Sequence, residues 1–100
     1  MMNEIELHKL TINAICKQYH VAYMYAFGSV LSDKFQKESD IDLLVKFQPF
    51  ELENYFNNYI GLKDALEKTF KRKVDLLEEQ TLKNPILIKS IGRNKQLIYG

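Results

Sequence analysis

The sequence predicts a single α/β (α+β) domain, built on a small mixed sheet of three to four strands flanked by helices. Segments with helical apolar spacing and segments with strand-like alternation take turns along the chain. Its 100 residues, 46% of them hydrophobic, are enough for one buried core. Because no repeat, low-complexity stretch or Gly/Ser-rich linker marks a boundary, we expect one domain over residues 1–100.

Helical spacing marks the first element. Apolar residues recur at helical intervals between Asn3 and Tyr19, and Asn3 with Glu6 three positions later resembles a capping box. We therefore expect one amphipathic helix over this stretch. The next segment, Val21–Phe27, is apolar on both alternating sets, which predicts a strand covered on two faces in the interior of the sheet.

A turn and a second strand follow. Gly28 ends the first strand, and Ser29 is placed to begin a short helical turn in which its hydroxyl can cap free backbone N–H groups. Residues 40–47 then alternate again, with an apolar set on one face. The other face carries Asp40 and Asp42, which is unusual because aspartate is depleted in strands.

The second half begins with a stretch, residues 50–58, that resists assignment. A helical pattern runs from Leu62 to Phe70, and Gly61 leaves its start open. The segment 73–77 (KVDLL) predicts a short third strand with Asp75 on its polar face.

The last predicted helix has clear boundary signals. Asn84 reads as its N-cap, Pro85 as its first residue and Gly92 as its stop. Residues 96–99 add a last strand or an ordered tail. The buried stripe of this helix is predicted to be Leu87, Ile88 and Ile91.

Composition excludes several function classes. Lys and Arg number 14 against 13 Asp and Glu, so the net charge of +1 supplies no broad field that would attract nucleic acid or an anionic membrane. Any phosphate affinity must be local. Cys16 is the single cysteine and is predicted to be a small core residue. With no apolar run of about 20 residues and no signal-peptide pattern, we expect a cytoplasmic protein.

The two aspartates point to metal chemistry. Residues i and i+2 of a strand face the same side, so the carboxylates of Asp40 and Asp42 should lie together and repel each other unless a cation sits between them. Mg²⁺ takes one or two protein carboxylates and completes its shell with water and substrate phosphates. Asp75 could add a third carboxylate, and three would serve two metals.

The pair Gly28-Ser29 supplies groups for binding phosphate. Glycine allows close approach of the backbone, while the serine hydroxyl and the N–H groups of the next turn are oriented donors. Each feature also has a plainer interpretation, because Gly-Ser turns are common and Asp40, Asp42 and Asp75 could simply face solvent. Their combination on successive strands favours a nucleotide site.

The run Gly28-Ser29, ten residues, then Asp40-x-Asp42 resembles the G-S-x10-D-x-D signature of the nucleotidyltransferase superfamily that includes DNA polymerase beta and kanamycin nucleotidyltransferase. The short length, the KVDLL acid and the NPILIKSI helix resemble its minimal nucleotidyltransferase (MNT) subfamily. This resemblance implies that Gly28 and Ser29 bind the triphosphate and that Asp40, Asp42 and Asp75 are catalytic ligands of Mg²⁺. It also implies a HEPN-domain toxin as partner in a hetero-oligomer, with AMP moved from ATP to a tyrosine of that toxin.

One position departs from the family pattern. Many members read G-S-x-A-R-G, and Ser32 stands here where the arginine would be. That arginine's role does not carry over, and a substitute would have to come from Lys34 or a later basic residue. Most of the basic residues in the second half are interpreted as a solvent-facing set: Lys68, Lys71, Arg72, Lys73, Lys89, Arg93 and Lys95.

Two functions therefore stay open. The first is a Mg²⁺-dependent nucleotidyltransferase that moves AMP, or another nucleoside monophosphate, onto a hydroxyl of a partner protein. The second is a non-catalytic antitoxin that neutralises its partner by masking it. The intact acids favour the enzyme, and Ser32 favours the binding module.

Overall fold

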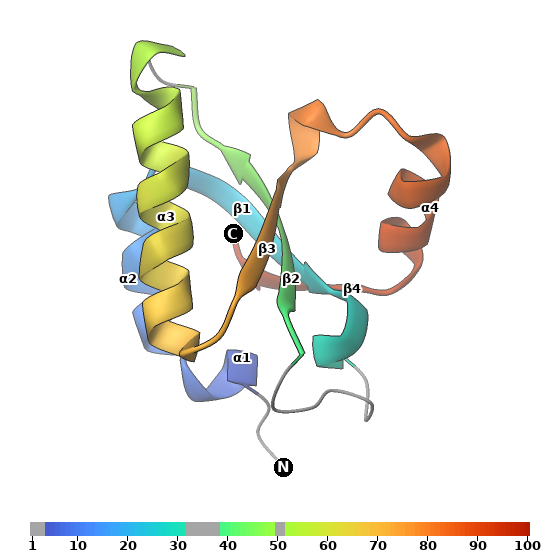
Figure 1. Cartoon of the computed structure of the whole chain (residues 1–100), viewed down its shortest axis with the longest axis horizontal. Helices are drawn as coiled ribbons and strands as arrows, with labels where there is room; N and C mark the ends of the chain where they lie inside the picture. Colours follow the sequence, from blue (N-terminus) through green and yellow to red (C-terminus); the bar gives the residue numbers. More distant parts are fainter. Residues whose placement is uncertain (1–3, 32–38, 50–51) are drawn as a thin grey trace.

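The computed structural model of the chain describes residues 4–31, 39–49 and 52–100 (Figure 1). It confirms the predicted fold class, a mixed α/β architecture. The four strands are β1 (Val21–Phe27), β2 (Ile41–Phe47), β3 (Val74–Glu78) and β4 (Lys95–Tyr99). The helices are α1 (Glu4–Leu7), α2 (Lys9–Gln18), α3 (Tyr55–Phe70) and α4 (Pro85–Arg93), and the short 3-10 turns are η1 (Gly28–Leu31), η2 (Leu52–Asn54) and η3 (Glu79–Thr81).

The strands form one mixed sheet in the order β3-β2-β1-β4. β1 runs antiparallel to both β2 and β4, while β2 runs parallel to β3. A parallel pair needs a long crossover connection, and α3 supplies it. β1 lies in the interior of the sheet, as its two apolar faces predicted.

The main core lies between one face of the sheet and helices α2 and α3. Ile41, Leu43 and Val45, which alternate along β2, are fully buried and belong to the same cluster as Leu62 and Leu66 of α3. This is the face that the apolar set of the second strand predicted. Cys16 of α2 is also fully buried in this cluster, as predicted.

Helix α4 lies on the opposite face of the sheet, away from α2 and α3 (Figure 1). Leu44, on the other alternating set of β2, is buried and shares a small cavity with Ile88 and Ile91 of α4. Neither Leu44 nor Ile91 belongs to the main core cluster. α4 therefore covers a separate and smaller apolar patch. Across the described ranges, no helix is both long enough and apolar enough to cross a membrane.

The expected helix over residues 3–19 is wrong as one element, because the structure has two helices that break at His8. The φ and ψ of His8 are −109° and 19°. Its ring packs edge-on against Phe70, and its Nε2 atom lies 3.7 Å from a carboxylate oxygen of Glu4. These contacts accompany the turn that brings the buried Ile5 to the core. The predicted cap Asn3 lies outside the described residues.

Other boundaries also differ from the predictions. α3 begins at Tyr55 and runs through Gly61, where the helix packs closely against Tyr19: a Cβ there would lie 2.6 Å from the Tyr19 ring. β3 is shifted by one residue to Val74–Glu78, and β4 confirms the expected last strand.

Helix α4 begins as predicted, since the Asn84 side chain accepts hydrogen bonds from the backbone N–H groups of the next turn. The predicted buried stripe is wrong in part, because Leu87 and Ile88 are 37% and 47% exposed. The reason is that α4 meets the sheet mainly through Ile91. Gly92 does not end the helix, which continues to Arg93.

Truncation of Leu66 tests the position of the core. Leu66→Ala should lower the free energy of unfolding by about 2 to 5 kcal/mol, because the side chain is fully buried between α3 and the sheet. Leu10→Ala is the matched control, since it removes the same atoms from a side chain that is 84% exposed, and it should cost less than about 0.5 kcal/mol. Urea denaturation measures both values. Equal losses would contradict this placement of the core.

Candidate active site

A row of four side chains crosses one end of the sheet. Asp75 of β3 pairs with Asp42 of β2, Asp42 pairs with Phe27 of β1, and Phe27 pairs with Lys95 of β4. Paired residues project to the same side of a sheet, so these four residues form one row on the face that carries α4. Across this row, the side chains change from two acids to an aromatic ring and then to a base.

The next row on the same face, further from the end of the sheet, is apolar. Its members, again paired strand by strand, are Leu77, Leu44, Tyr25 and Leu97. Apolar residues continue the face beneath the charged row, so the charged groups are confined to the end of the sheet. This contrast locates the polar chemistry at the strand ends that meet Gly28.

Asp42 is the half-buried member of three neighbouring acids, while Asp40 and Asp75 are exposed. Burial raises the pKa of the Asp42 carboxyl, and the negative charges of Asp75 and then Asp40 raise that pKa further. The three acids therefore act electrostatically on one another, as predicted. Among the described residues, the causes of this pKa shift are the burial of Asp42 and the charges of the other two acids.

Gly28 allows the turn after β1 to lie close to the Asp42 carboxylate. Its φ is +77°, a conformation that favours glycine, and a Cβ built on it would lie 2.4 Å from Oδ2 of Asp42. Only a residue without a side chain leaves the Asp42 carboxylate in its present place. Gly28 and Ser29 begin η1, which confirms the predicted helical turn. The Ser29 side chain lies outside the described atoms, so its phosphate role stays a prediction.

The acids fit a divalent cation by their chemistry and by their strand register. Neighbouring strands are about 4.8 Å apart, so the carboxylates of Asp42 and Asp75 can reach one cation, and oxygen ligands suit Mg²⁺. Burial is the largest cause of the raised pKa of Asp42, and the charges of Asp75 and Asp40, which such a cation would neutralise, raise it further. In the described part of the chain, no three acidic, histidine or cysteine side chains already form a metal cage. Metal binding would therefore draw these side chains together.

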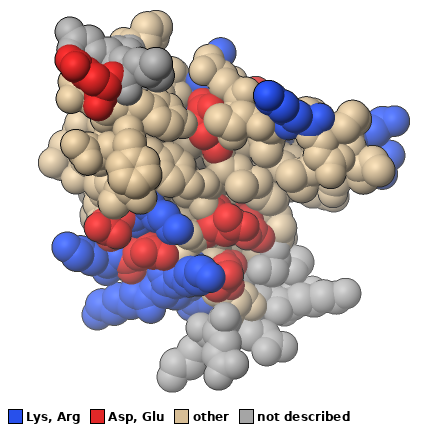
Figure 2. Space-filling view, turned by 45° about the horizontal axis from the view of Figure 1, so that its top comes forward, with Lys and Arg blue, Asp and Glu red and all other residues tan. Residues whose placement is uncertain are grey.

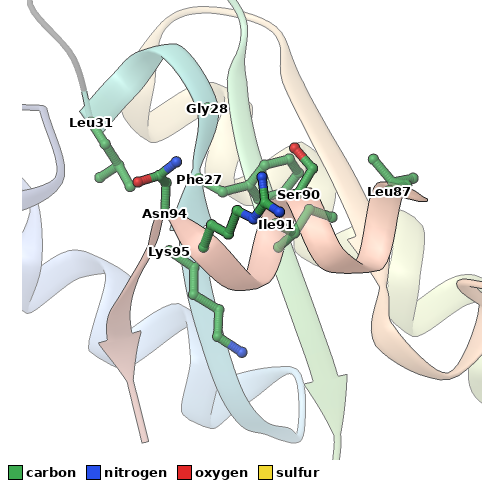
Figure 3. Close-up of a pocket in the computed structure, with 9 residues that line it drawn as sticks. Phe27, Gly28, Leu31, Leu87, Ser90, Ile91, Asn94 and Lys95 are labelled. Atoms are coloured by element: carbon green, nitrogen blue, oxygen red, sulfur yellow. The ribbon is translucent and has the colours of Figure 1, made fainter. Parts of the chain in front are cut away.

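A cavity of about 680 Å³ opens beside the Gly28 turn (Figure 3). Figure 3 shows Phe27, Gly28 and Leu31 along one wall and α4 along the other. The remaining lining residues come from α4 and the start of β4: Leu87, Ser90, Ile91, Arg93, Asn94 and Lys95. This volume is in the range of small-molecule sites.

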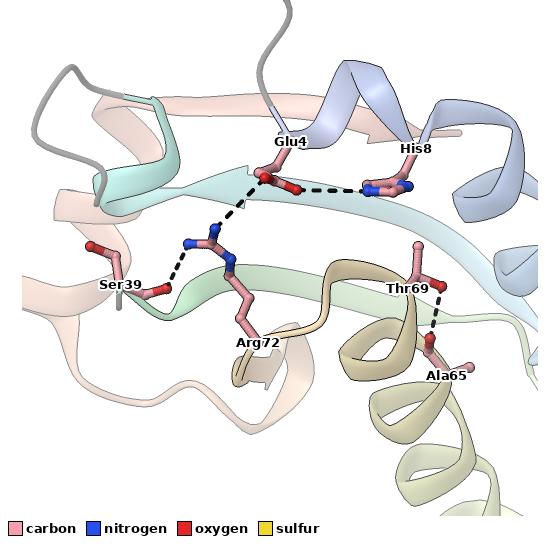
Figure 4. A network of polar contacts seen from close by, with 6 residues as sticks. All are labelled: Glu4, His8, Ser39, Ala65, Thr69 and Arg72. Carbon is pink, nitrogen blue, oxygen red and sulfur yellow. Dashed lines mark hydrogen bonds and ion pairs between the residues drawn. The ribbon is translucent and has the colours of Figure 1, made fainter. Parts of the chain in front are cut away.

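Arg72 is a positioning residue that the sequence did not reveal (Figure 4). It was included in the solvent-facing basic set, yet its Nη1 donates to the backbone oxygen of Ser39 at 3.2 Å. Its Nη2 lies 3.6 Å from a carboxylate oxygen of Glu4. Arg72 thereby ties α1 and the start of β3 to the residue before Asp40. No local pattern could signal these contacts, because they join three distant segments.

Charged groups of both signs lie near one another on one face of the molecule. Figure 2 shows basic and acidic groups of the described residues intermingled on the face that it draws. This agrees with the net charge of +1. Affinity for a phosphate group must therefore come from specific contacts at the site.

The close contact between Gly28 and Asp42 predicts coupled effects. Gly28→Ala should lower the free energy of unfolding by about 1 to 3 kcal/mol, through its positive φ and the crowding of Asp42. In an Asp42→Ala background this crowding is absent. The cost of Gly28→Ala should therefore be smaller there, by at least about 0.5 kcal/mol. Urea denaturation of the four proteins gives the coupling energy. Strictly additive costs would mean that the turn does not contact Asp42.

The raised pKa of Asp42 predicts a pH dependence of stability in metal-free protein. A carboxyl whose folded-state pKa is raised holds its proton longer in the folded state. Stability should therefore fall as pH rises from the ordinary pKa of 3.8 through the raised value, and should stay lower above it. Asp42→Asn should remove this loss, so it should stabilise the protein at pH 7 and not below pH 3.8.

Thermal melts across this pH range test that expectation. Asp64→Asn is the control, because it changes the same functional group at an exposed position on α3. If Asp42→Asn destabilises the metal-free protein at pH 7, the acids do not repel one another as described.

Comparison with known proteins agrees with this geometry. Residues 10–100 match the family model described as polymerase beta, nucleotidyltransferase. The chain is 38% identical over 84 residues to a candidate protein adenylyltransferase of Methanocaldococcus jannaschii, which covers 82% of this chain and 79% of that protein.

Solved structures agree with that match. The structure of a candidate minimal nucleotidyltransferase has a TM-score of 0.76 and 26% identity, with 95% of each chain covered. A chain from the complex of a tri-AMPylated Shewanella oneidensis HEPN toxin with its MNT antitoxin has the same fold, with a TM-score of 0.64, 18% identity, and coverage of 96% of this chain and 72% of that one. The chain therefore belongs to the polymerase beta nucleotidyltransferase family of enzymes, as its resemblance to the minimal nucleotidyltransferases predicted.

Proposed function

We propose that this protein is a Mg²⁺-dependent nucleotidyltransferase that moves AMP from ATP to the hydroxyl of a tyrosine on a HEPN-domain partner. The observation that carries the proposal is the pairing of Asp42 with Asp75 beside the Gly28 turn, in a chain of this family. Similarity to two known proteins supports the transfer of AMP and the choice of a protein as acceptor. One relative is named as a candidate protein adenylyltransferase, and one structural neighbour comes from a complex with a tri-AMPylated toxin.

Asp40, Asp42 and Asp75 are the residues that would hold Mg²⁺. When bound, the ion neutralises triphosphate charge and lowers the pKa of an attacking hydroxyl. The half-buried Asp42 is confined between the Gly28 turn and Asp75, which gives its carboxylate a defined direction. Gly28 lets the backbone of η1 come close to phosphate oxygens, and Ser29 follows it as a phosphate-binding residue.

The transfer itself is a displacement at phosphorus. The oxygen of the acceptor hydroxyl forms a bond to the α-phosphorus of ATP, the bond to the β-phosphate bridging oxygen breaks, and pyrophosphate leaves with that electron pair. The hydroxyl proton passes to a carboxylate. Asp75 suits this role because it is exposed on β3, an edge strand that an incoming acceptor can approach.

The small size of this domain suggests that the acceptor hydroxyl belongs to a partner protein. A domain of this size has little surface to hold a separate acceptor. A protein acceptor brings its own contacts, which gives a hetero-oligomer with the HEPN-domain partner.

A second function is favoured by one specific observation. Ser32 replaces the family's arginine. This replacement suits an antitoxin that neutralises its partner by masking it, with a site that is weak or unused.

One experiment separates the two functions. The protein is incubated with its HEPN-domain partner, Mg²⁺ and labelled ATP, and modification of the partner is followed by intact mass. We expect transfer of AMP to a partner tyrosine by the wild type and none by Asp40→Asn/Asp42→Asn, because the double variant lacks two of the three carboxylates. If both proteins neutralise the partner equally and neither transfers label, the masking function stands instead.

A further inference from the structure

The cavity beside the Gly28 turn contains a basic residue with no assigned role. Arg93 lies on the last turn of α4 and lines this cavity, which also includes Gly28 itself. It is exposed, and among the described residues its side chain has no hydrogen-bond or ion-pair partner. Its guanidinium group is therefore available to a ligand that occupies the cavity.

We propose that Arg93 binds the triphosphate of the nucleotide. This inference rests on the proposed function, and it concerns the phosphate half of the same site. The turn at Gly28 offers backbone N–H groups but no positive charge, and its neighbour across the sheet is the acid Asp42. A positive charge from another element would favour a tri-anionic or tetra-anionic ligand at that turn, and α4 lies along the facing wall (Figure 3).

Among the described lining residues, Lys95 is the other basic one, and its ammonium group already has a contact. Its ammonium nitrogen lies 4.3 Å from the centre of the Tyr25 ring, which is a cation–π distance. Figure 3 shows its side chain pointing away from Gly28. Lys95 must leave the Tyr25 ring to reach a phosphate at the turn, whereas Arg93 loses no such contact.

The backbone of Arg93 is held in a fixed place relative to the sheet. Ile91, two residues earlier, is 4% exposed and shares a cavity with Leu44 of β2. Asn84 caps the start of α4, and the N–H of Asn94 donates to the oxygen of Ile91 at 3.3 Å at its end. A planar guanidinium on such a support can donate two parallel hydrogen bonds to phosphate oxygens.

A purely structural role for Arg93 makes different predictions. A cation in the last turn of a helix stabilises the helix dipole, and that effect is present without any ligand. Loss of this role would lower the melting temperature of the ligand-free protein and would leave nucleotide affinity unchanged. Binding and ligand-free stability therefore have to be measured on the same variants.

The test compares Arg93→Gln with Lys89→Gln. Lys89 carries the same charge one turn earlier on α4 and does not line the cavity, so it controls for net charge and for helix stability. Calorimetric titration with Mg²⁺-ATP, and separately with Mg²⁺-tripolyphosphate, gives the dissociation constants. Tripolyphosphate lacks the base and ribose, so it reports on phosphate contacts alone.

We expect Arg93→Gln to weaken both ligands by about tenfold or more, the effect of losing a hydrogen bond to a charged group. Lys89→Gln should change both affinities by less than about twofold, and Arg93→Lys should recover part of the loss. Arg93→Gln values within the range of the Lys89→Gln control would overturn the inference and leave the proposed function intact. Weakening of ATP alone would also overturn it, because Arg93 would then contact the nucleoside. Failure of the wild type to bind either ligand would overturn both proposals.

Discussion

The parallel register between β2 and β3 is the constraint on which the site depends. It places Asp42 directly beside Asp75, although the two residues are 33 positions apart in a chain connected through α3. The register is set by apolar residues, because Ile41 and Leu43 pair with Val74 and Leu76 on the buried face. A slip of one residue would turn one of these apolar sets toward solvent. Core packing therefore holds the two carboxylates together against their repulsion.

The two faces of the sheet serve different purposes. Helices α2 and α3 bury most of the apolar side chains on one face, which provides the stability of the domain. The other face meets α4 over a small patch and leaves its end open, where acids, the Gly28 turn and a cavity adjoin. Because the pKa of Asp42 is raised, ionisation of this carboxyl opposes folding at neutral pH in the absence of a cation. Such a cost is typical of functional sites.

Much of the site could be predicted, because its motif residues lie on regular strands. Alternation placed Asp42 on the polar face of its strand, and a helical turn was expected after Gly28. Arg72 and Arg93 were not distinguished from other basic residues, because nothing in their local sequence separates a residue that faces solvent from one that faces Ser39 or a cavity. The break at His8 and the exposure of Leu87 were missed for a similar reason: each depends on a partner element distant in the chain.

The sequence by itself determined the strands, the turn and the identity of the acids, since alternation, glycine and spacing are local properties of the chain. Only the tertiary structure decided that Asp42 pairs with Asp75 and Phe27, and how close Asp42 lies to Gly28. It also decided that Arg93 lines the cavity wall opposite the turn. Register and helix docking depend on the packing of whole faces, and that packing brings together residues from both ends of the chain. The acids and the glycine turn can therefore be identified from the sequence, whereas the residues that surround them are determined by the tertiary packing.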